Sequence, residues 1–442
     1  MSKSHMDAPV SGAKLLLLPD VGRVAMSSAG LPDAVAGVVQ IQMDVFAAKM
    51  QEGLLAAATA VGLAVLDEMQ RVEIEAVAGP KGKHNPARIA VRHGTEESTL
   101  PMGGRRVAAK RHRVRAVDGS GELALQSWST LANTDVLNEH TVAAVLAGVS
   151  TRDYAEVLEP TGTAGSSTSK SAVSRRFIDA TAKRLEEFRS RPLGDRRWLV
   201  VYIDGFGFAD ELMLGALGVD AAGNKVPLSV RHGTTENGAV CRELLNDLER
   251  RGFDPSAGVL FVVDGGTAIG SAIRKKWGEC ALIQRCRAHK ARNVTDLVPL
   301  GERTRVHTAL FAAWAQPDAG EARKALRALA AKLDRTHPDA AASLREGLED
   351  TITVNRLGVT GTLLKTLATT NPMESTVDIV KVHARNVKRW MPGNMRLRWA
   401  AAGMLEAERQ YRRVKGFRQL DALARHLEAA VASGRTAVST AA

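Results

Sequence analysis

The chain has 442 residues, which is enough for two to four domains and for a large apolar core that needs no disulfide support. Its 60 Lys and Arg residues exceed its 48 Asp and Glu residues, and the resulting charge of +12, with a pI of about 9.8, indicates a polyanionic partner, nucleic acid being the first candidate. Three cysteines without a CxxC pair argue against a disulfide framework and a zinc ribbon, and the longest early apolar run is too short to span a bilayer, so we expect a cytoplasmic, nucleoid-associated protein without a membrane anchor.

The first 80 residues form an apolar, partly helical region to which the sequence assigns no activity. Residues 81–130 change to short alternating stretches separated by Gly turns, which predicts a small β element. Its middle is strongly basic, and a run of this kind is either a solvated strand face or a contact with the DNA backbone. The candidate DNA-binding residues are Arg105, Arg106, Lys110, Arg111 and Arg113.

Residues 131–190 predict a helix-turn-helix DNA-binding region. A first helix ends at Gly148, Ser150 caps a second, and a Ser/Thr/Gly loop leads to a third that opens at Ser169 or Ser171. The third helix places polar and basic side chains near its N-terminal end, where a recognition helix meets base edges and phosphates. Many three-helix clusters bind nothing, but the basic charge favours DNA binding. The candidate contacts are Lys170, Ser174, Arg175 and Arg176.

After a linker-like stretch, the segment 196–290 predicts strands and helices in the order βββαβαβ. A crossover helix returns the fourth strand parallel to the first, and usually beside it. Asp204 ends the first strand in YIDG, and Asp264 ends the fourth in VVDGG. We therefore expect the two carboxylates to lie side by side at one edge of the sheet.

Two carboxylates this close raise each other's pKa unless a cation lies between them. A pair of Mg²⁺ ions, for which Mn²⁺ can substitute, is our hypothesis, because hard divalent metals take carboxylate oxygens and keep waters for chemistry. Asp followed by Gly is also common turn chemistry, and for either residue alone that interpretation is the simpler one. A third carboxylate on a helix packed against this edge would complete a two-metal site for phosphodiester cleavage.

Residues 291–367 show only helical periodicity and are too long for a loop, which predicts an all-helical insertion before the last part of the chain, residues 368–442. That part opens with TTNPMEST, followed by a helix to about residue 390. Glu374 in this stretch is the candidate third carboxylate. The cations that return to its side of the helix, where they could bind phosphate, are Lys381, Arg385 and Lys388.

A purely structural interpretation of TTNPMEST remains open. Asn371 is a good N-cap, Pro372 suits the first helical position, and Glu374 falls where a capping-box carboxylate reaches back to the cap. The preceding RCRAHKARN contains a C-x-x-H pair, Cys286 and His289, which lacks the second pair of ligands that structural zinc needs. We expect this pair to support the acidic edge by fixing the helix after the fifth strand.

These motifs, in this order, resemble the Mutator-like transposases of bacterial insertion sequences: GVSTRDYAEVLE, SKSAVSRRF, YIDG, VVDGG, QRCRAHKARN, TTNPMES and RWAAAGMLEAERQYRRVKGF. The resemblance covers roughly residues 140–430. It implies an α/β, RNase H-like catalytic domain with an all-helical insertion, preceded by a helix-turn-helix region and a small β element. The implied acidic triad is Asp204, Asp264 and Glu374, supported by Cys286, His289 and Asn371.

The resemblance also implies a function. Such enzymes bind the terminal inverted repeats of their own element, cut its ends with Mg²⁺ and join the freed 3′-hydroxyl to target DNA. The expected partners are therefore double-stranded DNA and further copies of the chain, as a homodimer or larger assembly on DNA. Two alternatives are a catalytically inactive, transposase-derived DNA-binding protein or repressor, and an RNase H-like nuclease that only hydrolyses.

Overall fold

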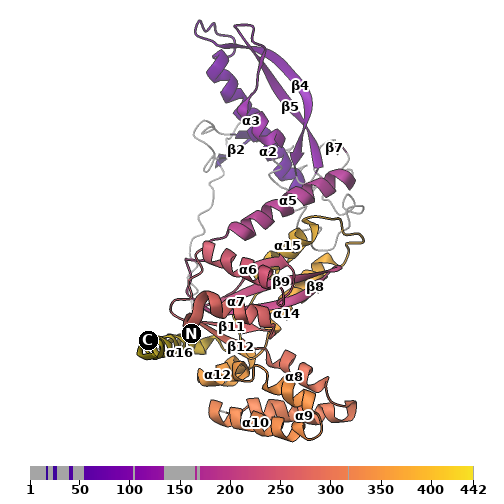
Figure 1. Ribbon diagram of the computed structural model, residues 1–442. Helices are drawn as coiled ribbons and strands as arrows, with labels where there is room; N and C mark the ends of the chain where they lie inside the picture. Colours follow the sequence, from indigo (N-terminus) through magenta and orange to yellow (C-terminus); the bar gives the residue numbers. More distant parts are fainter. Residues whose placement is uncertain are drawn as a thin grey trace, which may run out of the picture. The chain divides into compact units, whose positions relative to one another are not determined.

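The computed structural model describes residues 16–17, 23–26, 39–42, 54–102, 105–133, 165–166, 170–316 and 318–441. The chain divides into two compact units, Met1–Ala180 and Thr181–Ala442, and both contain strands and helices (Figure 1). Within the described ranges, no helix combines the length and the apolar character needed to cross a membrane.

The first unit is built around a long antiparallel hairpin of two strands that pair along most of their length. Its elements are β1 (Leu16–Leu17), β2 (Arg23–Met26), β3 (Val39–Gln42), α2 (Leu54–Ala78), β4 (Ala90–Met102), β5 (Arg105–Ala116), β6 (Glu122–Leu123), α3 (Gln126–Asn133) and β7 (Gly165–Ser166). Leu66 and Ile74 of α2 pack on the hairpin in two small apolar clusters. The hairpin occupies the residues for which the sequence predicted a small β element.

A long helix, α5 (Lys170–Ser190), occupies the position predicted for the third helix of the helix-turn-helix region. The first two helices of that region, at residues 141–158, lie outside the described residues. So do the side chains of Arg105, Lys170 and Arg176. On α5, Arg175 is exposed and Ser174 is half-buried.

The second unit contains a five-stranded sheet in the order β10-β9-β8-β11-β12. Its strands are β8 (Trp198–Phe208), β9 (Glu211–Asp220), β10 (Lys225–His232), β11 (Val259–Val263) and β12 (Ala281–Arg285). The first three are antiparallel, and β11 runs parallel to both β8 and β12. The predicted order of strands and the return of the fourth strand beside the first are both confirmed.

Helices cover both faces of this sheet (Figure 1). On one face α6 (Gly238–Arg250) and α7 (Thr267–Trp277) bury an apolar core with the strands. On the other face lie α14 (Asn371–Ala384) and α15 (Met395–Gln410), which contact β8, β9 and β10. The chain ends in α16 (Leu420–Ala441) after a short 3₁₀ turn, η5 (Phe417–Gln419).

The segment between β12 and α14 is helical throughout its described residues, as predicted. Its elements are α8 (Arg287–Thr295), α9 (Leu300–Trp314), α10 (Ala319–Asp334), α11 (Pro338–Arg345), η4 (Glu349–Ile352), α12 (Thr353–Arg356) and α13 (Gly361–Leu367). Helices α8 to α11 share an apolar core of their own, centred on Trp314, Leu326 and Leu344. Figure 1 shows α8, α9 and α10 gathered beyond β12.

The linker-like stretch before β8 is packed rather than free. Leu193 is 1 % exposed, and its carbonyl accepts a hydrogen bond from Trp198 Nε1 at 2.8 Å. Arg191 makes an ion pair with Glu408 of α15 at 2.9 Å. The sequence interpretation was wrong here because the polar, Pro-containing composition does not reveal which groups these residues meet.

Candidate active site

Strand pairing brings Asp204 and Asp264 next to each other. Val263, the last residue of β11, is paired in parallel register with Ile203 of β8, so Asp204 and Asp264 are the next residues along neighbouring strands. One detail of the prediction is wrong, because β8 does not end at Asp204. It continues to Phe208 as a partner of β9, with Asp204 opposite Gly215. The Gly after Asp204 therefore lies within a strand and not in a turn.

Helix α14 begins one residue earlier than predicted. Its N-cap is Thr370, whose carbonyl accepts from the backbone N–H groups of Met373 at 2.8 Å and Glu374 at 3.1 Å. Asn371 is therefore the first helical residue and not the cap. The backbone N–H of Thr370 donates to Cys286 Sγ at 3.4 Å, so this donor does not bond to the Glu374 carboxylate as a capping box would require.

A glycine in β9 lets α14 approach the sheet closely. A Cβ atom on Gly215 would lie 2.1 Å from Met373 Cε and 3.0 Å from a ring carbon of Phe206. Met373 is 1 % exposed and directly precedes Glu374 in the first turn of α14. The missing side chain at Gly215 thus makes the space in which Met373 docks, and this docking places Glu374 near Asp204.

Three side chains converge at this point. One ligand atom each from Asp204, His289 and Glu374 lies within 4.8 Å of the others. Asp204 is 5 % exposed, His289 is half-buried and Glu374 is exposed. His289 comes from α8, three residues after Cys286 at the N-cap of that helix. The predicted supporting histidine is thus close enough to the carboxylates to act with them directly.

Asp264 is held by a different set of contacts. Its Oδ2 accepts a hydrogen bond from the Thr235 hydroxyl at 2.7 Å, and its Oδ1 accepts from the Gly266 backbone N–H at 2.9 Å. Thr235 is 5 % exposed, and its carbonyl accepts from the Ile269 N–H at 3.0 Å in the first turn of α7. Asp264 is therefore oriented by the start of α7, beside the group formed by the other two carboxylates.

The electrostatics of the group reflect its crowding. Burial is the main cause that raises the pKa of Asp204 to about 6, and Asp264 and Glu374 add to the shift, while His289 and a hydrogen bond with Thr370 oppose it. The pKa of His289 is raised to about 9, first by its hydrogen bond to Cys286 and also by the charges of Asp204 and Asp264. The imidazole is therefore positively charged at neutral pH and partly balances the carboxylates.

These residues fit a divalent cation. Asp204 and Glu374 offer oxygen ligands of the kind that Mg²⁺ and Mn²⁺ prefer. Burial, which raises the pKa of Asp204, disfavours its charged form, and a bound cation would offset this cost. The two carboxylates, and not the charged imidazole, are therefore the groups that would hold a cation.

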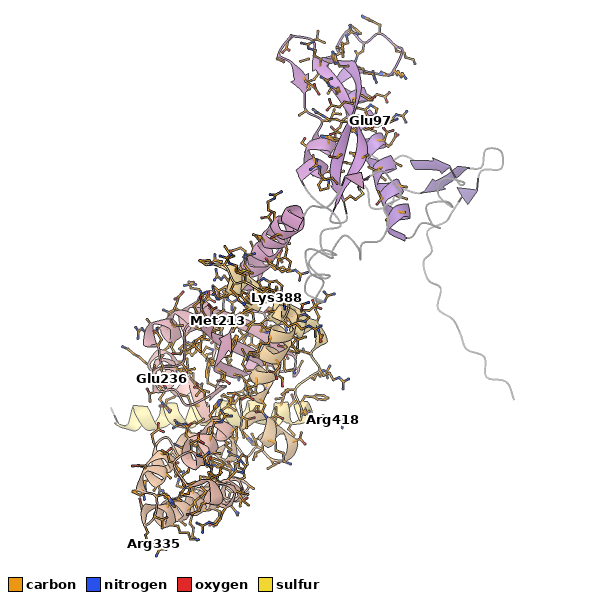
Figure 2. All side chains as sticks on the ribbon, turned by 90° about the vertical axis from the view of Figure 1, so that its right-hand side faces the viewer. Glu97, Met213, Glu236, Arg335, Lys388 and Arg418 are labelled. Carbon is orange, nitrogen blue, oxygen red and sulfur yellow. The ribbon has the colours of Figure 1, made fainter. Side chains whose placement is uncertain are left out.

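Only part of the predicted row of cations lies on α14. The helix ends at Ala384, so Lys381 lies in its last turn, Arg385 is its C-cap and Lys388 lies beyond it (Figure 2). The expected helix to residue 390 was wrong because Trp390 packs against Phe208 and Trp399, with ring centroids 5.3 and 6.2 Å away. These cations are nevertheless exposed, and Lys381 remains on the helix that carries Glu374.

The basic residues of β5 differ in their contacts. Arg111 pairs with Glu96 at 2.8 Å and with Glu122 at 3.0 Å, and Arg113 pairs with Glu122 at 2.8 Å. Arg106 is exposed and donates to Thr99, while Lys110 is exposed opposite Glu97. Part of the positive charge of β5 is thus already neutralised by carboxylates of the neighbouring strands. These carboxylates belong to Glu96 and Glu97 of β4 and Glu122 of β6.

Sequence reasoning missed three residues that shape the site: Thr235, Thr370 and Gly215. Nothing in the polar loop HGTTENG distinguishes Thr235, because its role depends on a contact with a residue 29 positions away. Thr370 stood beside the residue chosen as the cap. Gly215 did carry a signal, since a Gly inside an apolar strand often marks a close approach of another segment.

Comparisons with a family model and with individual proteins both found matches. The family model described as "Transposase, Mutator family" matches residues 46–411. The chain is 27 % identical to the transposase for insertion sequence element IST2 of Acidithiobacillus ferrooxidans over 176 residues, which are 40 % of this chain and 58 % of that protein. It is 30 % identical to the transposase for insertion sequence element IS1081 of Mycobacterium tuberculosis over 184 residues, which are 39 % of this chain and 42 % of that protein. These matches span less than two thirds of either relative, whereas the family model covers most of this chain. The chain belongs to the Mutator family of transposases.

Proposed function

We propose that this chain is an active DNA transposase, which binds the terminal inverted repeats of its insertion sequence, cuts the element ends and joins the freed 3′-hydroxyl to target DNA. The observation that carries the proposal is the convergence of Asp204, Glu374 and His289 within 4.8 Å, with Asp204 on the strand beside the one that Asp264 follows. Family membership and the sheet order support it.

The carboxylates of Asp204, Asp264 and Glu374 would hold the divalent cations, two Mg²⁺ ions in our proposal, with Mn²⁺ as a possible substitute. When bound, such ions supply the Lewis acidity that activates the attacking hydroxyl and stabilises the leaving oxygen. The protein contributes orientation. Thr235 and the Gly266 N–H fix Asp264, and the docking of Met373 at Gly215 fixes the start of α14.

We infer an RNase H-like organisation for the second unit from its sheet, in which three antiparallel strands are followed by two parallel ones and the acids come from neighbouring strands. Recognition of the inverted repeats is proposed for the helix-turn-helix region and the β4–β5 hairpin. Arg175, Arg106 and Lys110 are exposed there, whereas Arg111 and Arg113 would have to exchange carboxylate partners for phosphates.

The alternative of a catalytically inactive DNA-binding descendant would require a decayed site. All three candidate carboxylates are present, and two of them lie with His289 in one group. A protein that had lost the reaction would have no need to keep a buried Asp204, whose isolation from water destabilises its charged form. We therefore favour the active enzyme.

The deciding experiment compares Glu374→Gln with Asp378→Asn, a matched control one turn further along the same exposed helix. Both variants and the wild type are assayed for Mg²⁺-dependent cleavage of a duplex that carries the gene's own flanking sequence. We expect cleavage to fall below detection in Glu374→Gln, because an amide is a poor ligand for a hard cation, while DNA binding and thermal stability persist.

Asp378→Asn should cleave like the wild type. Normal cleavage by Glu374→Gln would remove Glu374 from the triad. If both variants lost cleavage equally, the result would show that cleavage depends on the total negative charge of the helix and not on Glu374 as a metal ligand. The absence of cleavage by the wild type on its own flanks would contradict the proposed function itself.

A further inference from the structure

The loop between α15 and α16 concentrates positive charge on the surface of the second unit. Its four cations are all exposed. The guanidinium groups of Arg413 and Arg418 lie over the ring of Phe417, 5.1 and 6.0 Å from its centroid. The four loop cations are Arg412, Arg413, Lys415 and Arg418. Together with Lys225 and Lys365 they are called the basic platform below.

The backbone beneath the platform is held in place by its neighbours. The Val414 N–H donates to the Gly223 carbonyl in the β9–β10 turn at 2.9 Å. The Thr366 hydroxyl of α13 donates to the Lys415 carbonyl at 3.3 Å. Gly416 has φ +85°, and a Cβ atom there would lie 2.7 Å from the Leu363 nitrogen. The cations therefore stand on a fixed scaffold and not on a loose loop.

Two further cations extend this surface. Lys225, the first residue of β10, places its Nζ 4.5 Å from the centre of the Tyr411 ring. Burial lowers the pKa of Lys225, and the charge of Lys415 lowers it further. Lys365 is exposed on α13, next to the residue that bonds Lys415. Three separate elements thus contribute positive charge to one surface, and these charges repel each other.

No carboxylate in the described part of the chain forms an ion pair with the platform. The two nearest acids on α15 are occupied elsewhere, since Glu406 pairs with Arg409 and Glu408 with Arg191. Asp421, at the start of α16, is exposed and pairs with none of the platform cations. The charge of these exposed cations is therefore available to an external anion.

Part of the positive charge of the helical insertion is neutralised by carboxylates on the same surface; the pairs are Arg303–Asp296, Arg305–Glu302, Arg323–Glu349 and Arg345–Asp334. The platform cations differ from these arginines, because no carboxylate of the described residues pairs with them.

The platform lies within reach of a duplex at the candidate active site. Tyr202 is two residues before Asp204 on β8, and its hydroxyl donates to the carbonyl of Thr366 at 3.3 Å, the same residue whose hydroxyl donates to the Lys415 carbonyl. The β9–β10 turn, to which the platform loop bonds, lies beside Trp198 at the start of β8. Trp198 is six residues before Asp204, so the turn and Asp204 are separated by about 20 Å along the strand. This distance is shorter than one turn of B-DNA, which is about 34 Å long.

We propose that the basic platform binds the phosphate backbone of a duplex DNA segment without reading its sequence. The proposal rests on the proposed function, because it takes DNA as the partner. It adds a contact surface whose loop cations follow the residues matched by the family model, since that match ends at residue 411. Arginines pre-oriented by an aromatic ring and fixed lysines suit phosphate oxygens, which lie at regular intervals along a duplex.

The test is a binding measurement that needs no cleavage. The triple variant Arg412→Gln, Lys415→Gln, Arg418→Gln is compared with the wild type and with a matched control, Lys324→Gln, Lys332→Gln, Arg335→Gln, whose residues are exposed on the insertion. Figure 2 labels Arg418 and Arg335 on well-separated parts of the unit. The probe is a fluorescent duplex of unrelated sequence of about 30 base pairs, roughly three helical turns.

We expect the platform variant to bind this duplex about tenfold more weakly or worse, because three cations are lost. The slope of the logarithm of the binding constant against the logarithm of the salt concentration should become less steep, by the equivalent of about 2 to 3 phosphate contacts. The control should bind within about twofold of the wild type. Equal losses in both variants, or no loss in the platform variant at unchanged thermal stability, would overturn the proposal.

A second pair of assays identifies the source of the bound duplex. If the platform variant is slow in cleaving the flanked duplex, the platform holds the DNA that is being cut. If cleavage is normal and only the joining of a pre-cut end into an unrelated plasmid is slow, it holds the target. Either result supports the platform. Because binding is measured separately, a wild type that never cleaves would contradict the proposed function and leave the binding result intact.

Discussion

Asp204 is the most buried of the three candidate carboxylates, and its surroundings determine whether it binds a proton or a cation. Its pKa of about 6 lies above the ordinary value of 3.8, chiefly because of burial. A raised pKa in the folded state means that the protonated form stabilises the fold. That contribution is complete below about pH 4 and is lost as the pH rises through 6.

This gives a prediction for metal binding. A cation must displace the proton, so Mg²⁺ affinity should be about tenfold weaker at pH 5 than at about pH 7. Calorimetric titration of Mg²⁺ at several pH values checks this expectation. Asp378→Asn should keep the pH dependence, and Asp204→Asn should lose both the affinity and its pH dependence. Equal wild-type affinities at pH 5 and pH 7 would contradict the assignment of Asp204.

At the scale of elements, the contact between β9 and α14 decides where Glu374 lies. Gly215→Ala would introduce a methyl group 2.1 Å from Met373 Cε, in a place that Phe206 and Met404 also border. We expect a loss of about 1 to 3 kcal/mol in the free energy of unfolding, because buried side chains must move to relieve the overlap. Cleavage should fall as well, since α14 carries Glu374.

A double-mutant cycle with Met373→Ala tests the mechanism of this loss. Met373→Ala alone leaves a cavity that should cost about 2 to 5 kcal/mol. In the double variant the new methyl group occupies part of that cavity, so the combined loss should be clearly smaller than the sum of the two single losses. Urea unfolding of the four proteins measures the coupling. Additive losses would show that the two residues do not share this space.

The elements also show how much of the fold the sequence could predict. Apolar runs bounded by turn residues located all five strands of the sheet, and the place of the fourth strand beside the first followed from the rule for crossover connections. The ends of α14 were misplaced because tertiary contacts set them: Thr370 is tied to Cys286 at one end, and Trp390 packs against Phe208 at the other. Helix periodicity contains no information on either contact.

The candidate site was predictable to a similar degree. Register placed Asp204 beside Asp264, and a polar helix start pointed to Glu374. The orientation of Asp264 could not be predicted, because the hydroxyl that holds it belongs to a loop whose position depends on α6 and α7. Nor did the C-x-x-H spacing show that His289 would lie with the carboxylates.

At the scale of the second unit, two buried cations of α8 join that helix to the later helices of the insertion. Arg287 is 3 % exposed and donates to the Thr351 carbonyl at 2.9 Å and to Asn355 Oδ1. Lys290 is fully buried and donates to the carbonyls of Ser343 and Glu346. Both lie on α8 with His289, so the same short helix holds the insertion and contributes to the candidate site.

Arg287→Met should therefore destabilise the protein by roughly 2 to 5 kcal/mol, because buried acceptors on η4 and α12 lose their donor. Hydrogen exchange should speed up first in α9 to α11. Arg292→Met, which removes the same charge from an exposed position on α8, is the control and should exchange like the wild type. Protection that stays unchanged in Arg287→Met would show that the apolar core of the insertion is sufficient to hold its helices together.

The bond between the Tyr202 hydroxyl and the Thr366 carbonyl joins residues 164 positions apart in the chain. A ribosome makes the first unit and the whole of β8 long before it makes the helix that carries Glu374. If the proposed function holds, a growing or prematurely terminated chain can present the candidate DNA-binding residues of its first unit while its acid set is incomplete. Partial products would then occupy element ends without cutting them, and synthesis itself would delay the reaction until most of the chain is made.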